Sequence, residues 1–275
     1  MITSQIKKVV NNKFFLAESP LKISKKHLIW IDIYSKKLIF LNLLNKKIKT
    51  KKFTQNPGFV INKKNNLIIG LQNKIINYCI KTNKVKIVLK LSDKKGLRTN
   101  DGCLDEYGNL WFGVLDEKKK NRGGLYCKFK NKDGVIKIFG DINTPNGPVF
   151  ASKKIFFFND TSRCITYRCE IKFNKIIQKK FKVFKNNSKP DGMYLDKKKK
   201  RLWICLFGDS KIKCYNLRGK FLNLIKLKAK NITNCTMDGY RKNILYITTA
   251  YKNIGLSKSK KSCDGCIFEV KNKFI

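Results

Sequence analysis

The sequence is poor in acidic residues and in histidine, and it contains no long apolar run. Its 275 residues include 18 Asp and Glu against 62 Lys and Arg, with a single histidine, His27. No stretch approaches the roughly 18 apolar residues that a membrane-spanning helix needs. Near the start, Asn11, Asn12 and Lys13 interrupt the apolar residues, so no continuous secretory-signal segment is present. The sequence therefore predicts a soluble cytoplasmic protein with no membrane partner.

Arginine is scarce among the basic residues, and this argues against a specific nucleic-acid partner. The formal charge of +44 comes from 55 Lys and only seven Arg. A protein selected to bind phosphates or base edges favours Arg, because its planar guanidinium matches their geometry. The lysines are instead spread over every turn, as codon bias in an AT-rich genome would leave them. We therefore expect no specific nucleic-acid partner.

The ten cysteines do not indicate a disulfide framework in a cytoplasmic protein. They are expected to be reduced thiols, which behave as small apolar residues on strands. Cys263 and Cys266 form a lone C-x-x-C motif, and a zinc site there needs two further soft ligands. Because His27 is far away in the sequence, we do not expect structural zinc at this motif.

One three-strand pattern recurs six times along the chain. Its clearest copy starts at 190–196 and ends in two strands, 202–207 and 211–215, joined by a Gly-Asp-Ser turn that suits a tight hairpin. The six hairpins begin at Leu28, Leu67, Leu110, Ile155, Leu202 and Leu245. A period of about 40 to 50 residues without helical periodicity is typical of propellers. The sequence therefore predicts an all-β fold, a six-bladed β-propeller, with residues 1–275 as a single domain.

A second phrase precedes each hairpin: a polar residue or Pro, followed by a short apolar strand. In a propeller the first strand of each blade lines the central channel, so the leading residues of these strands converge at one mouth. We therefore expect a polar cluster made of Glu18, Asn100, Asn146, Asp191 and Asn234. Two carboxylates with amide oxygens suit Ca²⁺, Mg²⁺ or Mn²⁺, and Zn²⁺ less well. The alternative is that these residues only cap turns at the blade entrances.

Five short motifs carry a family resemblance: Asn100-Asp101-Gly102, Leu110-Trp111-Phe112-Gly113, Asn146-Gly147, Pro190-Asp191-Gly192 and Thr233-Asn234-Cys235. With them the chain resembles the senescence-marker-protein/gluconolactonase/luciferin-regenerating-enzyme family. The resemblance extends over nearly the full length, from Ala17 to Phe268. The family fold is a six-bladed propeller, which agrees with the number of repeats. Ala17 and Ser19 depart from the pattern, because Gly is common at both positions.

The resemblance implies a metal site. The family holds one divalent metal ion with a Glu, an Asn and an Asp, and these roles fall on Glu18, Asn146 and Asp191. The expected ion is Ca²⁺, Mg²⁺, Mn²⁺ or Zn²⁺, and oxygen-only ligands favour Ca²⁺. Asp191 is also the expected catalytic base, with activation of water by the metal as the alternative.

The resemblance also implies a substrate site. The sugar-lactone enzymes of the family hold substrate hydroxyls with an Arg and an Asn two residues apart, and these roles fall on Arg98 and Asn100. A further acidic residue often lines the pocket after the segment that ends at Gly113. Asp116 and Glu117 both stand close to that position, and the sequence does not choose between them.

The implied activity is metal-dependent hydrolysis of a small sugar lactone, most simply an aldonolactone. Two alternatives remain open, an organophosphate or phosphotriester hydrolase on the same fold and a non-catalytic calcium-binding propeller. Arg98 and Asn100 favour a polyol substrate, because directional hydrogen bonds select strongly for hydroxyl groups. Retention of all three metal ligands argues against a non-catalytic scaffold. The expected partner is a small-molecule lactone, and the chain is expected to be a monomer or a weak homo-oligomer.

Overall fold

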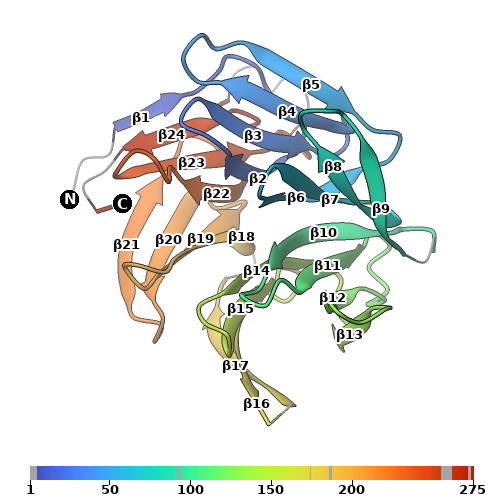
Figure 1. The fold of residues 1–275 in the computed structure, drawn as a ribbon. Helices are drawn as coiled ribbons and strands as arrows, with labels where there is room; N and C mark the ends of the chain where they lie inside the picture. The colour runs from blue at the N-terminus through green and yellow to red at the C-terminus, as the bar shows by residue number, and fades with distance from the viewer. Residues whose placement is uncertain (1–4, 92–93, 174, 186–187, 255–261, 272–273) are drawn as a thin grey trace. The chain divides into compact units, whose positions relative to one another are not determined.

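The chain folds into strands that form six four-stranded sheets. A computed structural model describes residues 5–91, 94–173, 175–185, 188–254, 262–271 and 274–275. Within these ranges every regular element is a strand, and each sheet is one blade of a six-bladed β-propeller (Figure 1). The predicted fold class is confirmed. In the same ranges no helix is long and apolar enough to cross a membrane.

The chain divides into two compact units, each with three blades. The first unit comprises Met1–Asn56 and Asp191–Ile275. Its sheets have the strand orders β2-β3-β4-β5, β18-β19-β20-β21 and β1-β24-β23-β22. The strand bounds are β1 Gln5–Lys8, β2 Ala17–Lys22, β3 His27–Asp32, β4 Lys37–Asn42, β5 Ile48–Lys52, β18 Lys189–Asp196, β19 Arg201–Phe207, β20 Lys211–Asn216, β21 Phe221–Lys226, β22 Ile232–Met237, β23 Ile244–Thr249 and β24 Phe268–Lys271.

The second unit comprises Pro57–Pro190. Its sheets have the strand orders β6-β7-β8-β9, β10-β11-β12-β13 and β14-β15-β16-β17, in simple sequence order. The strand bounds are β6 Pro57–Lys63, β7 Asn66–Leu71, β8 Lys74–Cys79, β9 Val85–Lys90, β10 Leu97–Leu104, β11 Leu110–Asp116, β12 Gly124–Lys128, β13 Ile136–Phe139, β14 Pro145–Phe150, β15 Ile155–Asp160, β16 Ile165–Lys172 and β17 Lys175–Val183. The expectation of a single domain over 1–275 stays a prediction.

The six predicted hairpins are present, and each begins within one residue of the predicted start. They are β3–β4, β7–β8, β11–β12, β15–β16, β19–β20 and β23–β24. β1 was not predicted from the sequence; it pairs with β24 and supplies the fourth strand of the last blade. Its four residues, QIKK, are exposed, so they carry no apolar pattern that a sequence reading could detect.

The second strand of each blade is buried on both faces, and this explains its continuous apolar sequence. Every residue of β11 is buried, and Phe156, Phe157 and Phe158 of β15 have no exposed surface. Within the second unit, the Trp111 ring of one blade packs against Phe156 of the next, with ring centroids 5.1 Å apart. A strand covered on both sides has no reason to alternate polar and apolar residues.

The innermost strand of a blade bends at the polar phrase that the sequence analysis identified. Shifts of pairing register fall between Glu18 and Leu21, Pro57 and Phe59, Asn100 and Gly102, Asn146 and Val149, and Ile232 and Asn234. Ser19, Asp101 and Gly147 have positive φ angles of 48°, 29° and 53° at three of these places. A β-bulge inserts an extra residue and changes the direction of neighbouring side chains. The phrase therefore marks a recurring bulge as well as the start of a strand.

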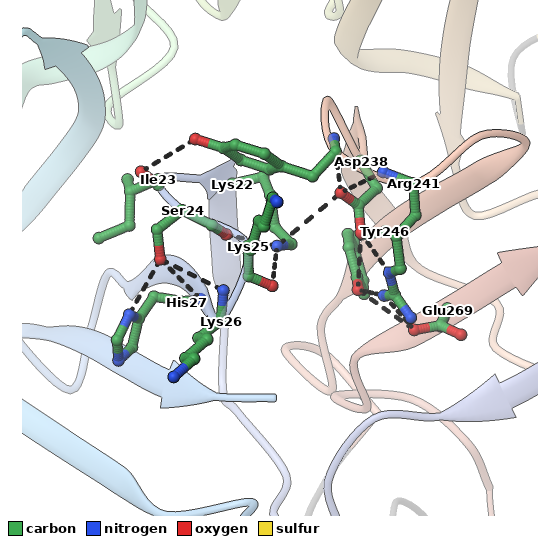
Figure 2. A network of polar contacts seen from close by, with 11 residues as sticks. Lys22, Ile23, Ser24, Lys25, Lys26, His27, Asp238, Arg241, Tyr246 and Glu269 are labelled. Atoms are coloured by element: carbon green, nitrogen blue, oxygen red, sulfur yellow. Dashed lines mark hydrogen bonds and ion pairs between the residues drawn. The ribbon is translucent and has the colours of Figure 1, made fainter. Parts of the chain in front are cut away.

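A polar cluster with buried carboxylates joins the first and last blades of the first unit at the end of β2 (Figure 2). Arg241 pairs with Asp238 at 2.8 Å and with Glu269 at 3.0 Å, and its guanidinium also donates to the Tyr246 hydroxyl. Lys22 is the last residue of β2, and its Nζ lies 3.8 Å from Asp238 Oδ1. Only 2% of the Lys22 side chain is exposed. Two of the 18 acidic residues therefore serve this joint between blades.

Candidate active site

In the second unit, β10 and β14 bring two of the predicted site residues into contact. Asn100 and Asn146 are buried, and the Asn100 amide nitrogen donates to the Asn146 side-chain oxygen and to the Pro145 carbonyl. Gly113 pairs with Asn100 across the β10–β11 ladder, and an added Cβ there would come within 2.9 Å of Pro145. A glycine at this position therefore lets the two blades approach each other.

The amide orientations in this group follow from a chain of hydrogen bonds. Arg98 can only donate, so Asn100 presents its oxygen to Nη1 at 2.9 Å and its nitrogen to Asn146. Asn146 must then accept with Oδ1 and donate with Nδ2, which reaches the Thr161 hydroxyl at 2.8 Å. Thr161 donates in turn to the Pro190 carbonyl. These hydrogen bonds hold the Asn146 side-chain oxygen in one direction, as a metal ligand requires.

Arg98 is a buried residue and not an ordinary surface cation, since only 4% of it is exposed. Nη1 donates to the Thr99 carbonyl at 3.0 Å as well as to Asn100, and Nε donates to Glu117 at 3.2 Å. These contacts use the planar, forked geometry of the guanidinium. Arg98 thereby positions both Asn100 and Glu117.

The two acidic candidates after Gly113 have different environments. The fully buried Asp116 carboxylate accepts backbone N–H groups from Lys118 and Lys120 at 3.0 Å and pairs with Arg122. The Arg122 hydrogen bond holds the pKa of Asp116 well below its ordinary value. The Glu117 side chain is 40% exposed and contacts Arg98. Asp116 therefore stabilises its loop, whereas Glu117 belongs to the Arg98 group.

In the first unit, Glu18 of β2 and Asp191 of β18 are both buried. Burial raises the pKa of the Cys205 thiol, and its hydrogen bond with Cys235 and the negative charges of Asp191 and Glu18 raise it further. Both carboxylates thus act on one thiol from two different blades. Glu18 and Asp191 thus lie on the inner strands of two blades of this unit, as the sequence predicted.

Asn234 lies next to the Asp191 strand in the same unit. The Gly192 backbone lies against the Asn234 side chain, and any Cβ at Gly192 would overlap it. The Asn234 oxygen accepts the N–H of Cys235 at 2.8 Å, and Thr233 donates to the Ala17 carbonyl of β2 at 2.6 Å. The inner strands of these three blades are therefore in close contact beside Glu18 and Asp191.

Each unit has oxygen donors of the kind that a hard divalent cation binds. In the first unit Glu18 and Asp191 are buried carboxylates, and in the second unit Asn146 has an oriented amide oxygen. A dication would balance the charge of the two buried carboxylates. Among the described residues, no three His, Cys, Asp or Glu side chains form a metal cluster. The predicted set does not depend on such a cluster, because its third ligand is an amide.

Asp101 and Thr161 also shape this group, although neither was predicted as a site residue. The Asp101 carboxylate accepts the N–H of Gly147 at 2.7 Å, which ties the β10 bulge to the β14 bulge. Thr161 orients Asn146 from the turn after β15. Asp101 stands in the Asn100-Asp101-Gly102 motif, but no sequence signal distinguishes Thr161 from other turn residues.

Comparisons with known proteins agree with this architecture. A Bacillus subtilis protein assigned as a sugar lactone lactonase, YvrE, is 27% identical over 235 residues, covering 81% of this chain and 79% of its own length. Regucalcin of Danio rerio is 24% identical over 283 residues, covering 98% and 95%. The solved structure of a luciferin-regenerating enzyme matches with a TM-score of 0.87 at 20% identity, covering 98% and 95%.

A gluconolactonase from Xanthomonas campestris also shares the fold, with a TM-score of 0.77 at 14% identity over 98% of this chain and 90% of its own. Residues 16–251, most of the chain, match the SMP-30/gluconolactonase/LRE-like region. The matched segment contains Glu18, Arg98, Asn100, Asn146 and Asp191. The chain therefore belongs to the SMP-30/gluconolactonase/LRE-like family.

Proposed function

We propose that this protein is a divalent-metal-dependent lactonase that hydrolyses small sugar lactones. The main support is the buried hydrogen-bond chain that orients Arg98, Asn100 and Asn146, because such a chain prepares polar groups for a polyhydroxylated ligand. Further support comes from relatives named for sugar lactone and gluconolactone hydrolysis.

In this proposal Glu18, Asn146 and Asp191 hold the cation. All three are buried oxygen donors, and Ca²⁺ suits them best because it accepts carboxylate and amide oxygens in flexible geometry. A cation held there would supply Lewis-acid chemistry, which would polarise the lactone carbonyl and stabilise negative charge on its oxygen.

The protein's own residues orient the substrate and move a proton. Asp191 accepts a proton from the attacking water, since a carboxylate beside the reacting carbonyl can act as general base. Asn100 and Glu117 accept hydrogen bonds from the sugar hydroxyls, and Arg98 positions both side chains. We assign Glu117 to the substrate in preference to Asp116, whose carboxylate is occupied by its own loop.

The rival functions have less support. A phosphotriesterase has no evident need for a buried Arg98–Asn100 pair that selects hydroxyl groups. A non-catalytic calcium-binding propeller would need the carboxylates but not the Arg98–Glu117 contact.

A hydrolysis screen tests the function directly. Proton release is recorded over a panel of aldonolactones and phosphotriesters, with purified protein, with EDTA, and with Ca²⁺, Mg²⁺, Mn²⁺ or Zn²⁺ added back. We expect sugar-lactone hydrolysis above the spontaneous rate, loss with EDTA, and recovery with at least one metal ion. Phosphotriester hydrolysis in its place, or no turnover with any metal ion, would contradict the proposal.

Arg98→Lys separates substrate positioning from metal binding. Lysine has one ammonium group, so it cannot bond Thr99, Asn100 and Glu117 in the same geometry. We expect kcat/KM for the preferred lactone to fall about 10- to 100-fold. The ratio of kcat/KM between good and poor lactone substrates should also decrease. Metal affinity, measured by calorimetry, should change less than about threefold, an estimate that treats the metal ligands as intact. A parallel loss of metal affinity would place Arg98 among the groups that support the cation.

A further inference from the structure

A cluster of three aromatic rings and one lysine lies beyond the strand ends next to Glu18. This rim cluster consists of Phe15, Tyr34, Tyr251 and Lys252, all in the first unit. In β2 and β3, Ala17 pairs with Asp32, and the backbone N–H of Ile33 bonds to the Leu16 carbonyl. The chain positions that follow at this end are Phe15 and Tyr34. The cluster therefore lies at the Glu18 end of β2, and Lys22 stands at the other end.

The neighbouring blade reaches the same place. Ile232 pairs with Thr249 at the start of β22, and the Ala250 N–H bonds to the Asn231 carbonyl. Tyr251 and Lys252 follow directly. The Phe15 ring packs edge-on against both tyrosines, with centroids 5.6 Å from Tyr34 and 5.2 Å from Tyr251. All four residues are half-buried, so they keep part of their surface exposed to ligands.

Lys252 is held in place at several points, unlike a typical surface lysine. Its N–H donates to the Phe15 carbonyl at 3.1 Å, and its carbonyl accepts from the Asn231 amide at 3.1 Å. Its ammonium donates to the Tyr34 hydroxyl at 3.0 Å and lies 4.5 Å from the centre of that ring. Asn231 is itself fixed by Asp264, which accepts its backbone N–H at 2.9 Å.

Ordering a lysine side chain costs about 2 kcal/mol of rotamer entropy, so a fixed ammonium at a rim calls for a compensating role. The neighbouring backbone also fits closely around this cluster. Gly265 has a φ of 79°, and a Cβ there would come within 2.7 Å of the Tyr251 ring, so only glycine lets the backbone pack against that ring. An ammonium group with free hydrogen-bonding capacity beside aromatic faces recognises an anion on a ligand that also has an apolar or ring surface.

We propose that the rim cluster is a specificity subsite for lactones that carry an anionic group at the end remote from the lactone carbonyl, with Lys252 binding that anion. The inference rests on the proposed lactonase function. Phe15 and Glu18 are three positions apart, so their Cα atoms are at most about 11 Å apart and the cluster begins within that distance of the proposed metal ligand. A six-carbon sugar lactone with a terminal phosphate or carboxylate spans a distance of this order. Phe15, Tyr34 and Tyr251 offer ring faces and edges to its carbon skeleton.

The test compares neutral and charged lactones in the Lys252→Met variant. The probes are glucono-1,5-lactone, its 6-phosphate, and the 1,4-lactone of glucaric acid, which carries a carboxylate. We expect kcat/KM for at least one charged lactone to fall about tenfold, and for the neutral lactone to fall less than twofold, the loss of one charge-assisted hydrogen bond. The charged probe with the larger loss identifies phosphate or carboxylate as the natural group. Tyr34→Phe, which keeps the ring and removes the hydroxyl, should give a smaller loss in the same direction.

Lys26→Met is the matched control, because it removes one exposed lysine beyond the opposite end of β2. An equal loss in this control would reduce the effect to bulk charge and overturn the proposal, as would equal losses for neutral and charged lactones. If the protein hydrolyses no lactone, the subsite can still be tested by measuring the binding of gluconate and 6-phosphogluconate by calorimetry. Selective loss of 6-phosphogluconate binding in Lys252→Met supports the subsite, and unchanged or absent binding of this ligand contradicts it.

Discussion

Asp191→Ala should reduce lactone hydrolysis to the spontaneous rate, a loss of roughly a thousandfold or more. The substitution removes a carboxylate that serves both as metal ligand and as general base in the proposed mechanism, and a positioned base alone contributes about 10²- to 10⁴-fold. Metal affinity, measured by calorimetry, should fall with the rate. Thermal stability without added metal should stay close to that of the parent protein.

Two comparisons make this result specific. Asp196→Ala removes a carboxylate from the other end of the same strand, where it accepts only a turn N–H from Lys199 among the contacts described, and it should keep rate and metal affinity. Glu18→Gln keeps the shape of a ligand but removes its charge, so excess metal should restore part of the rate. Wild-type rate and metal affinity in Asp191→Ala would place the active site elsewhere.

Asp238→Ala should be the most damaging of these changes for stability. It leaves the N–H groups of Tyr240 and Arg241 without their acceptor and removes the charge that faces Lys22 and Arg241 (Figure 2). Breaking a buried pair costs about 3–5 kcal/mol, and the half-exposed Arg241 places this case near the lower value. A loss of about 3 kcal/mol corresponds to a decrease in Tm of about 6–12 °C for a chain of this size.

The same carboxylate predicts the direction of the pH response. Burial by itself would raise the pKa of Asp238, but hydrogen bonds from Arg241 and Tyr240 and the charge of Lys22 bring the pKa below its ordinary value. Its contribution to stability is therefore complete above the unfolded-state pKa of about 4 and is lost as the pH falls through the folded value. Thermal melts should show that the difference in Tm between the parent protein and Asp238→Ala becomes smaller as the pH is lowered from 7 into the acid range.

Asp133→Ala provides the matched comparison, because Asp133 is an exposed acidic residue in a turn. It should change the unfolding free energy by less than about 0.5 kcal/mol. A similar loss of Tm in both variants would attribute the effect to net charge in a lysine-rich chain and not to the cluster around Asp238.

The fold could be predicted from the sequence because its repeating unit is local. Each hairpin has a buried second strand with a continuous apolar run and a tight turn, so six copies remain visible without any long-range information. β1 could not be found in this way. Its register with β24, where Gln5 pairs with Lys271 and Lys8 with Phe268, depends on contacts between residues that are 260 to 266 positions apart.

The site could be predicted only in part. Polar residues in phase at the start of inner strands identified Asn100 and Asn146, which are in contact, and Glu18 and Asp191, which act on a common thiol. The sequence could not choose between Asp116 and Glu117, because one backbone position separates a carboxylate that caps its own loop from one that contacts Arg98. Side-chain direction decides this difference, and it depends on the local turn.

The pairing of β1 with β24 has a consequence for how the chain is made. Residues near the beginning emerge from the ribosome long before their partners, and the last blade of the first unit lacks its outer strand until both are present. During that interval β1 has no partner strand, and an unpaired strand edge is a template for pairing with other chains. The four residues of β1 are exposed and two of them are lysines, so the unpaired segment stays soluble. The lysine charges also disfavour pairing with the edge strand of another chain. Completion of the last blade is thus a late, entropically expensive step that couples the two ends of the sequence in one cooperative event.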